Sequence, residues 1–265
     1  MEQNQYTRTA LLMGEENLAK LHGSRVAVFG VGGVGGYVVE ALARSGVGTL
    51  DLIDNDVVSL SNLNRQIIAL HSTLGQYKVD VAAERIHDID PQIRVNTYKC
   101  FYLPEKRGNF DFTQWDYIVD AVDTVTAKID IIAEAARCHV PIISACGCGN
   151  RMDPARLTVT DLYKTVNDPL AKVLRRECRR RGIKKLTVVC STEPAIKPLT
   201  DGNAETDEKG TQEKGKKRFV PGSTAFVPAA AGLLAASRVI RDLTGFDGSE
   251  RTKAALKGKS EQETT

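Results

Sequence analysis

A glycine-rich turn follows the first predicted strand and opens a helix. The turn reads GVGGVGG and has the spacing G-x-G-x-x-G, and its candidate site residues are Gly30, Gly32, Gly33 and Gly35. Glycines let the backbone approach a phosphate closely, and the N-terminus of the following helix offers free N–H groups and the positive end of its dipole. Asp54 ends the second predicted strand, where a carboxylate can bind a ribose hydroxyl. The pattern predicts a nucleotide site and leaves the kind of nucleotide open.

Further polar residues follow Asp54 along the chain. The segment 54–66 reads DNDVVSLSNLNRQ, Lys78 begins the next predicted helix, and Asp123 ends the fourth predicted strand. Ligands of open α/β sheets bind at the carboxyl edge of the strands, where these residues are expected to converge. A nucleoside triphosphate carries more charge than a dinucleotide and is bound by Arg, Lys and a carboxylate-held Mg²⁺. The spacing favours ATP with Mg²⁺, although surface charges and a helix cap would give the same residues.

Alternating strands and helices must position these side chains. Short apolar runs predict strands at 25–29, 49–54, 93–98, 117–122 and 141–145, and later at 157–161 and 186–190. Helical spacing of apolar residues predicts helices at 9–22, 37–45, 75–89 and 126–138, and later at 168–181 and 228–243. The alternation predicts an α/β fold, a Rossmann-like and mostly parallel sheet with helices on both faces. The C-terminal strands are expected to extend this sheet.

No linker divides the chain clearly, so we expect one domain over residues 1–245. Residues 1–150 would form its nucleotide-binding half and residues 151–245 its substrate-facing half. Residues 200–217 lack any large apolar side chain, which predicts a mobile surface loop. Residues 246–265 are expected to form a frayed tail.

Composition sets the broad class of the protein. Of the 265 residues, 42% are hydrophobic and 26% are charged, which excludes a disordered or low-complexity chain. Six cysteines are too few for a disulfide scaffold, and charges within residues 1–20 argue against a secretory leader, so a cytoplasmic location is expected. The stretch 223–240 is rich in Ala and Gly and is interrupted by Pro228. It predicts a buried helix rather than stable membrane insertion.

The motifs GVGGVGG, LIDNDVVSLSNLNRQ, GQYKVDVAAERIHDIDP and DAVDT together resemble the ubiquitin-activating-like adenylating family. That family includes the activators of the sulfur carriers for thiamin and molybdopterin, and the resemblance covers residues 8–150. It implies that Asp54 binds ribose and that Asp123 holds Mg²⁺. It also implies that the phosphates of ATP are held by Asn64, Arg65 and Lys78.

The same resemblance implies a shared site. Arg8 in YTRTALLMG matches the position of an arginine that reaches the ATP of a partner subunit in that family, so a homodimer is expected. Asp56 and Gln66 are expected to lie in the nucleotide site. The residues with implied catalytic roles are Arg8, Arg65, Lys78 and Asp123.

Beyond residue 150, the segments RMDPARLTVTDLYKTVNDPLAKVLRRECRRRGI and CSTEPAIKP resemble one branch of that family, the tRNA threonylcarbamoyladenosine dehydratases. The resemblance implies ATP-dependent cyclisation of the threonylcarbamoyl group on adenosine 37 of tRNA through an acyl-adenylate. The ring-closing step is intramolecular, so no enzyme nucleophile is required. The one candidate for such a nucleophile is Cys190 in VVCSTE, which could carry sulfur or an acyl group in a related mechanism. We interpret it instead as a buried strand thiol.

A strongly basic segment could contact tRNA. Residues 172–185 read KVLRRECRRRGIKK, with eight basic residues and one Glu. On a helix Leu170, Leu174 and Cys178 share the inward face, and the arginines are expected to splay outward. Such a surface suits salt-dependent contact with RNA phosphates, although a solvated basic face would look the same. The expected tRNA contacts are Arg175, Arg176, Arg179, Arg180, Arg181, Lys184 and Lys185.

Three other functions are carried as alternatives. One is an adenylyltransferase that activates the C-terminus of a ubiquitin-like sulfur-carrier protein, against which the basic segment argues. Such activators often bind zinc through two CxxC pairs, which this chain lacks. The others are a nicotinamide-dependent reductase, against which Arg65 and Lys78 argue, and a non-catalytic nucleotide-binding scaffold. The sequence leaves open a monovalent cation (Na⁺ or K⁺) and a cysteine-desulfurase or sulfur-acceptor partner.

Overall fold

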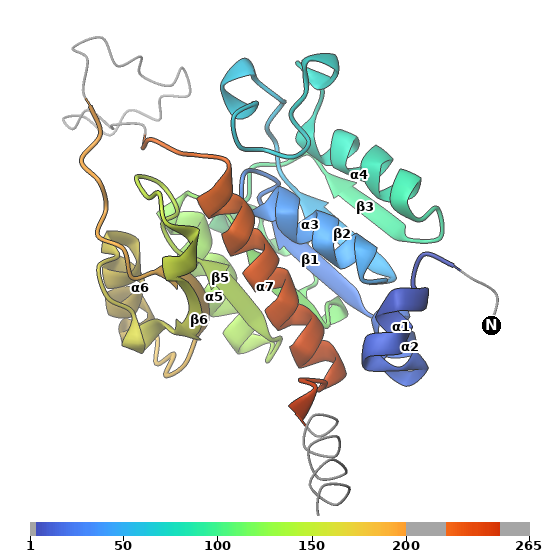
Figure 1. The fold of residues 1–265 in the computed structure, drawn as a ribbon. Coiled ribbons are helices and arrows are strands. Elements are labelled where there is room, and N and C mark those ends of the chain that lie inside the picture. The colour runs from blue at the N-terminus through green and yellow to red at the C-terminus, as the bar shows by residue number, and fades with distance from the viewer. Residues whose placement is uncertain (1–3, 200–220, 250–265) are drawn as a thin grey trace, which may run out of the picture.

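Seven strands form one sheet within residues 4–199 and 221–249, which are the residues that the structure, a computed structural model, describes (Figure 1). The order is β3-β2-β1-β4-β5-β7-β6, and only the edge strand β6 runs antiparallel to its neighbour. This confirms the predicted α/β class and the extension by the C-terminal strands. The strands are β1 Arg25–Phe29, β2 Thr49–Ile53, β3 Arg94–Tyr98, β4 Tyr117–Asp120, β5 Ile142–Ala145, β6 Leu157–Asp161 and β7 Thr187–Ser191.

The register of the central strands sets the position of the glycine turn. Phe29 at the end of β1 lies opposite Ile53 of β2 and opposite Asp120 of β4. Because these strands are parallel, the segments that follow them leave the sheet at the same edge. The glycine turn, Asp54 and the DAVDT segment are therefore brought together by backbone pairing alone.

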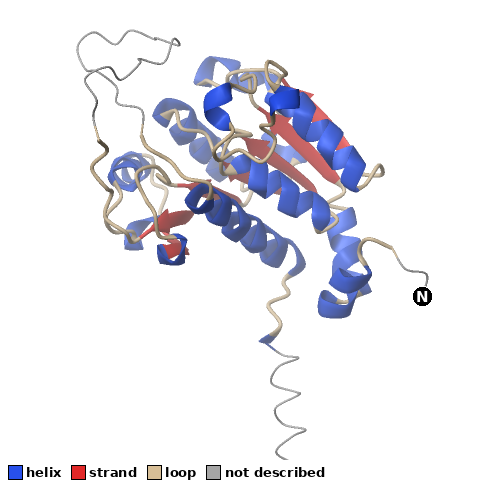
Figure 2. Cartoon of the chain, turned by 45° about the horizontal axis from the view of Figure 1, so that its top comes forward, coloured by secondary structure: helices blue, strands red, loops and turns tan. Residues whose placement is uncertain are grey.

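Three helices cover one face of the sheet, α3 Gly35–Arg44, α4 Lys78–Ile89 and α7 Phe226–Thr244 (Figures 1 and 2). A Cβ added at Gly232 of α7 would lie 2.5 Å from the carbonyl oxygen of Val34, so the two backbones touch there. This confirms the predicted buried helix, which begins at Phe226, two residues before its predicted start at Pro228. In the described residues, every helix is too short or too polar to cross a bilayer.

The opposite face is covered by α5 Val125–Arg137, α6 Pro169–Arg180 and the irregular segment 99–116. Phe29 of β1 packs on this face against Tyr102, Phe112 and Trp115. The helices on both faces agree with the prediction made from the alternation of strands and helices.

The N-terminal helix differs from its prediction. Instead of one helix over 9–22, the chain forms α1 Thr7–Met13 and α2 Glu15–His22, because Gly14 adopts φ 87° and breaks the helix between them. The hydroxyl of Tyr6 donates to Asp90, which fixes α1 at the C-terminal end of α4. The predicted mobile loop 200–217 lies outside the described residues, as does the predicted frayed tail from residue 250 on.

Candidate nucleotide-binding site

The glycine turn is built so that only glycine fits at two of its positions. Gly30 adopts φ 86°, and a Cβ there would lie 2.8 Å from the carbonyl oxygen of Ala121. A Cβ at Gly35 would lie 1.8 Å from the carbonyl oxygen of Gly30. The turn therefore packs directly on the DAVDT segment and starts α3 with its N–H groups facing the edge of the sheet.

Asp54 fixes the turn from the end of β2. Its Oδ2 accepts a hydrogen bond of 2.7 Å from the amide of Val31, and its Oδ1 accepts one of 2.8 Å from the amide of Asp56. An ionised carboxylate has about four lone-pair sites, so it can still accept bonds from two ribose hydroxyls. The expected ribose contact remains a prediction that this geometry allows.

Lys78 joins the same set of residues from the first position of α4. Its Nζ lies 3.0 Å from Oδ2 of Asp56, and its side chain is only 7% exposed. The amide of Lys78 also donates to the carbonyl oxygen of Asp56, at 2.9 Å. Asp56 thus fixes both the amide and the ammonium group of Lys78 at the carboxyl edge of the sheet. This is the edge at which a bound phosphate chain is expected.

Asn64, Arg65 and Gln66 lie over the glycine turn. The side chain of Arg65 lies 3.5 Å from the position that a Cβ of Gly33 would take, and that of Gln66 lies 3.8 Å from the corresponding position of Gly32. Gln66 is buried, and its Oε1 has no hydrogen-bond partner within the described residues. A buried acceptor without a donor is costly, so this atom suits a bound hydroxyl or amine.

The side chain of Asn64 also reaches the chain that precedes α7. Its Nδ2 donates to the carbonyl oxygen of Ser223, at 3.0 Å, and its Oδ1 accepts from the guanidinium of Arg65, at 2.9 Å. The structure therefore brings together the predicted residues from three segments, namely 30–36, 54–66 and Lys78, and adds residues 223–228, which no sequence motif indicated.

Asp123 lies at the rim of this site and is exposed. Its Oδ1 has one weak contact, 3.4 Å from the hydroxyl of Thr124. Mg²⁺ in phosphate-transfer sites takes one or two protein carboxylates and completes its shell with water and phosphate oxygens. An exposed carboxylate beside the glycine turn fits such an ion, and within the described residues no cluster of three His, Cys, Asp or Glu side chains offers an all-protein metal cage.

A buried ion pair that the sequence analysis missed supports the DAVDT segment. Nζ of Lys128 lies 2.8 Å from Oδ2 of Asp120 and 3.0 Å from the carbonyl oxygen of Ala145. The hydroxyl of Ser144 donates to the same carboxylate at 2.6 Å. The pair ties the ends of β4 and β5 beneath Asp123. A lysine among apolar residues of the helix at 125–137 was the only available signal.

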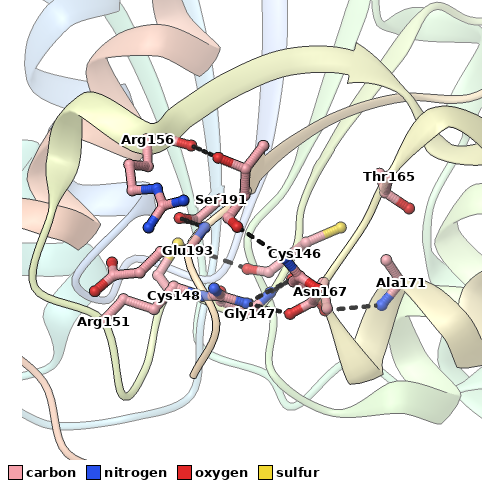
Figure 3. Close-up of polar contacts among 12 residues, drawn as sticks. Cys146, Gly147, Cys148, Arg151, Arg156, Thr165, Asn167, Ala171, Ser191 and Glu193 are labelled. Atoms are coloured by element: carbon pink, nitrogen blue, oxygen red, sulfur yellow. Dashed lines mark hydrogen bonds and ion pairs between the residues drawn. The ribbon is translucent and has the colours of Figure 1, made fainter. Parts of the chain in front are cut away.

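The loops that leave β5 and β7 contribute to a cluster of polar contacts (Figure 3). Asp168 caps α6 by accepting from the amide of Ala171 and also accepts from the amide of Gly147. Arg151 is buried, and its guanidinium donates to the carbonyl oxygens of Gly147 and Asn167. The cluster therefore joins three loops into one rigid surface, and none of its polar members was singled out from the sequence.

Glu193 anchors that cluster after β7. Its carboxylate accepts from the amides of Asp153, at 3.0 Å, and Met152, at 3.1 Å. These amide bonds, that of Asp153 above all, lower the pKa of Glu193 below its usual 4.5 against the opposing effect of desolvation. The amide bonds therefore favour the ionised carboxylate, although Glu193 is only 8% exposed.

All six cysteines are free thiols. Cys190 is buried on β7, and burial raises its pKa, which agrees with the interpretation of a strand thiol. Burial also raises the pKa of Cys148 to about 12. Such thiols remain protonated and are weak nucleophiles at neutral pH.

Arg8 does not join the other site residues within one chain. It is exposed on α1, which is fixed by Tyr6 at the C-terminal ends of α3 and α4. The glycine turn lies at the other end of α3, which with its 10 residues is about 15 Å long. Within one chain, Arg8 therefore lies at the end of α3 opposite to the glycine turn.

The basic helix α6 matches its predicted inward face at Leu174 and Cys178, which are buried, whereas Leu170 is half-buried. Arg175 contradicts the prediction that the arginines splay outward, because it is half-buried and donates to Thr165. Its guanidinium donates to the carbonyl oxygen of the preceding loop, so it is directed toward Thr165. The exposed basic side chains of this surface are Arg176, Arg179, Arg180, Arg181, Lys184 and Lys185.

Charge on this surface is partly neutralised. Glu177 forms ion pairs of 3.0–3.1 Å with Arg176, Arg180 and Arg181. The hydrogen bond from Arg181 is the main cause that lowers the pKa of Glu177, so the carboxylate stays ionised. Arg179 lies over the ring of Tyr163 at 5.3 Å. The surface remains strongly basic, since one carboxylate faces many cations.

The glycine turn, the acid after β2 and the helix-borne lysine on a β3-β2-β1-β4-β5 sheet define a nucleotide-binding α/β protein. The model of the ThiF family matches residues 6–263, and the chain belongs to this family. The chain is 43% identical to the tRNA threonylcarbamoyladenosine dehydratase of Bacillus subtilis (strain 168) over 241 residues, which are 91% of this chain and 94% of that protein.

Solved structures agree with this placement. The E. coli tRNA N6-threonylcarbamoyladenosine dehydratase, TcdA, in complex with AMP matches with a TM-score of 0.79 and 34% identity, and covers 95% of this chain and 96% of that one. The same E. coli protein in complex with ATP matches with a TM-score of 0.79 and 33% identity. By contrast, the adenylyltransferase and sulfurtransferase UBA4 of Vanderwaltozyma polyspora matches 52% of this chain and 31% of that protein, at 35% identity.

Proposed function

We propose that this chain uses ATP to cyclise the threonylcarbamoyl group of a tRNA adenosine, with release of AMP and pyrophosphate. The observation that carries the proposal is the 43% identity to the Bacillus subtilis dehydratase, which extends over 91% of the chain. The similarity to the dehydratase extends into the half of the chain beyond residue 150. The sulfur-carrier alternative has weaker support, because the match to UBA4 covers only 52% of the chain.

In the first step a carboxylate oxygen of the substrate attacks the α-phosphorus of ATP. The bond from the α-phosphorus to the bridging oxygen breaks, pyrophosphate leaves and an acyl-adenylate forms. Lys78 and Arg65 would neutralise charge on the phosphates, and the N–H groups of the glycine turn would orient them. Support comes from the burial of Lys78 beside Asp56 and from the approach of Arg65 to Gly33. Asp123 would hold Mg²⁺, which supplies charge neutralisation at the phosphates when bound.

In the second step a nitrogen of the same modification attacks the activated carbonyl carbon. The ring closes, the bond between that carbon and the AMP oxygen breaks, and the proton of the nitrogen is lost to solvent. The substrate oxygen leaves with AMP, so the nucleoside loses the elements of one water. The step is intramolecular and needs orientation more than an enzyme nucleophile, which fits the buried, protonated thiols of this chain.

The proposal includes a homodimer with two shared sites. One support is the position of Arg8, because it lies near the C-terminal end of α3 and the glycine turn of its own chain lies at the N-terminal end. The other is the exposure of two leucines on α1, the helix that carries Arg8. Leu11 is 73% and Leu12 68% exposed on α1, beyond what a solvent-facing helix usually shows. A second copy that covers α1 would bury these leucines and bring Arg8 to a nucleotide.

The proposed reaction also implies a tRNA partner and a cytoplasmic location for the protein. The exposed basic residues of α6 and of the segment after it would contact tRNA phosphates, with no sequence preference of their own. ATP, Mg²⁺ and reduced thiols suit the cytoplasm. A monovalent cation and a sulfur-transfer partner remain proposals without a supporting contact among the described residues.

The test is direct. The protein is incubated with ATP-Mg²⁺ and tRNA that carries threonylcarbamoyladenosine, and the nucleosides are then analysed by mass spectrometry. We expect that nucleoside to lose one water in a reaction that depends on ATP. An unchanged nucleoside, together with pyrophosphate exchange that only a sulfur-carrier protein stimulates, would instead establish the adenylyltransferase alternative.

A further inference from the structure

A cavity of about 240 Å³ lies between the start of β1 and the segment 109–115, on the face of the sheet that carries α5 and α6. Three aromatic rings and four polar side chains line it, namely Tyr98, Phe110, Trp115, Arg25, Asn109, Asp111 and Gln114. We name it the aromatic cavity. It shares no residue with the candidate nucleotide site.

The walls of the aromatic cavity are held in place by a buried carboxylate. Asp51 of β2 has no exposed surface and accepts two bonds from the guanidinium of Arg25, at 2.7 and 2.9 Å. The hydroxyl of Tyr98 donates to the same carboxylate at 3.1 Å. Arg25 also donates to Oε1 of Gln114, at 2.8 Å. The cavity is therefore preformed and its cation is already paired, so it does not attract an anion.

One hydrogen-bond donor in the wall has no partner. Trp115 is 5% exposed, and its buried Nε1 is one of few such side-chain atoms without a partner in the described part of the chain. A buried N–H that is removed from water without an acceptor is destabilising, and native structures seldom keep one. The indole therefore calls for an acceptor atom in or beside the cavity.

We propose that the aromatic cavity binds an unpaired nucleobase. A nucleobase is a neutral planar ring that stacks on aromatic side chains and carries ring-nitrogen or carbonyl acceptors for the Trp115 N–H. Its exocyclic amine can donate to the carboxylate of Asp111, an exposed residue that also lines the cavity. The basic helix α6 lies on the same face of the sheet, so a nucleic acid could contact both. The base could belong to RNA or to a free nucleoside, and the test separates these sources.

The emission of Trp115 reports on the cavity directly, since the chain has one tryptophan. The full chain with Asp54→Asn, which weakens the nucleotide site, is titrated with adenosine, with cytidine and with an anticodon stem-loop RNA. We expect saturable quenching of Trp115 by at least one of them. Quenching by the nucleosides assigns a free-nucleoside site, and quenching by RNA alone assigns an RNA base. Emission that stays constant up to about 10 mM nucleoside and with the RNA would overturn the proposal.

Two variants locate the effect. Phe110→Leu removes a ring from the wall and should weaken binding about tenfold, whereas Phe101→Leu removes an exposed ring outside the cavity and should not change it. Trp115→Phe keeps a ring but removes the N–H, and calorimetry should show affinity lowered about fivefold. Quenching that Phe110→Leu leaves intact contradicts the proposal. Because none of these readouts uses catalysis, the result is independent of the cyclisation reaction.

Discussion

Nζ of Lys128 lies 2.8 Å from Oδ2 of Asp120, and neither side chain has any exposed surface. The ammonium group also donates to the carbonyl oxygen of Ala145, and the carboxylate accepts from Ser144. The ends of β4 and β5 are thus held together directly beneath the segment that carries Asp123 and supports the glycine turn. We therefore assign this pair a structural role, because Lys128 bonds the carbonyl oxygen of Ala145 and so positions the strand ends that support the site.

Lys128→Met should destabilise the protein by about 3–5 kcal/mol, because it leaves the Asp120 carboxylate buried without a counter-charge. Equilibrium unfolding in urea measures the change. The matched control Lys20→Met removes a half-exposed surface ion pair and should change the free energy of unfolding by about 0.5 kcal/mol or less. Adding Asp120→Asn to Lys128→Met should recover part of the loss. Equal effects of the two lysine variants would show that the buried pair carries no special weight.

Lys78→Ala should lower AMP formation by about 100-fold or more, because the phosphates lose a fixed cation in a partly dry site. Release of labelled AMP from ATP in the presence of modified tRNA measures this. The control is Lys99→Ala. Lys99 forms an ion pair of 2.7 Å with Asp80 of α4, the helix that carries Lys78, but its side chain is half-exposed. This variant should form AMP at the rate of the wild type. Turnover that survives Lys78→Ala would show that the phosphates lie elsewhere.

Arg8→Ala should lower AMP formation as strongly as Lys78→Ala if each site takes Arg8 from a second copy. Mixing the two inactive variants should then restore activity, because a mixed dimer has one site with both Arg8 and Lys78 intact. Activity of the mixture at different ratios measures the restoration. A mixture as inactive as its components, with dimers verified by light scattering, would exclude the shared site.

Removal of charge from α6 should weaken tRNA binding in a salt-dependent way. Arg179→Ala with Arg180→Ala should reduce the slope of log affinity against log salt by about 1–2, as expected if each residue neutralises one phosphate. Filter binding at several salt concentrations gives the slope. Arg175→Ala should leave the slope unchanged, because this side chain donates to Thr165. Affinity for ATP should be the same in all variants.

Stability should fall in acid through Glu193. Its pKa is lowered in the folded protein, so the folded state binds this proton less readily than the unfolded chain does. The stability it contributes is complete above its usual pKa of 4.5 and is lost as the pH falls through the lowered value. Glu193→Gln should therefore be destabilised at pH 7, with a gap from the wild type that narrows below about pH 4.5. A gap that stays constant in urea unfolding between about pH 7 and pH 3 would contradict this, and Glu84→Gln on the exposed side of α4 is the control.

Much of the fold could be predicted from periodicity. The strands β1 to β7 and the helices α3 to α7 lie within a few residues of their predicted bounds. The central parallel strands are buried and mostly apolar, and the helices have apolar spacing. The edge strands β3 and β6 are less buried and carry more polar residues. The break at Gly14 was missed, since Leu11, Leu12 and Leu18 gave one continuous helical pattern. Only the left-handed φ of Gly14 divides it.

Part of the candidate site could also be predicted from the sequence, and part could not. The glycine turn, Asp54 and Lys78 were found because their motif lies in one stretch of sequence or at a predicted element end. Lys128, Arg151 and Glu193 were missed, because each also bonds a residue at least 16 positions away along the chain. These partners are Ala145, Asn167 and Asp153, in that order. The roles assigned to Asn64, Gln66 and Asp123 toward ATP remain predictions that the geometry permits.

The fate of one oxygen atom tests the central claim most directly. The threonyl carboxylate of the modified tRNA is labelled with heavy oxygen, the protein and ATP-Mg²⁺ are added, and the released nucleotide is analysed by mass spectrometry. Attack on the α-phosphorus predicts AMP that carries one heavy oxygen, together with unlabelled pyrophosphate. Unlabelled AMP, or ADP with the heavy oxygen in free phosphate, would contradict activation through an acyl-adenylate.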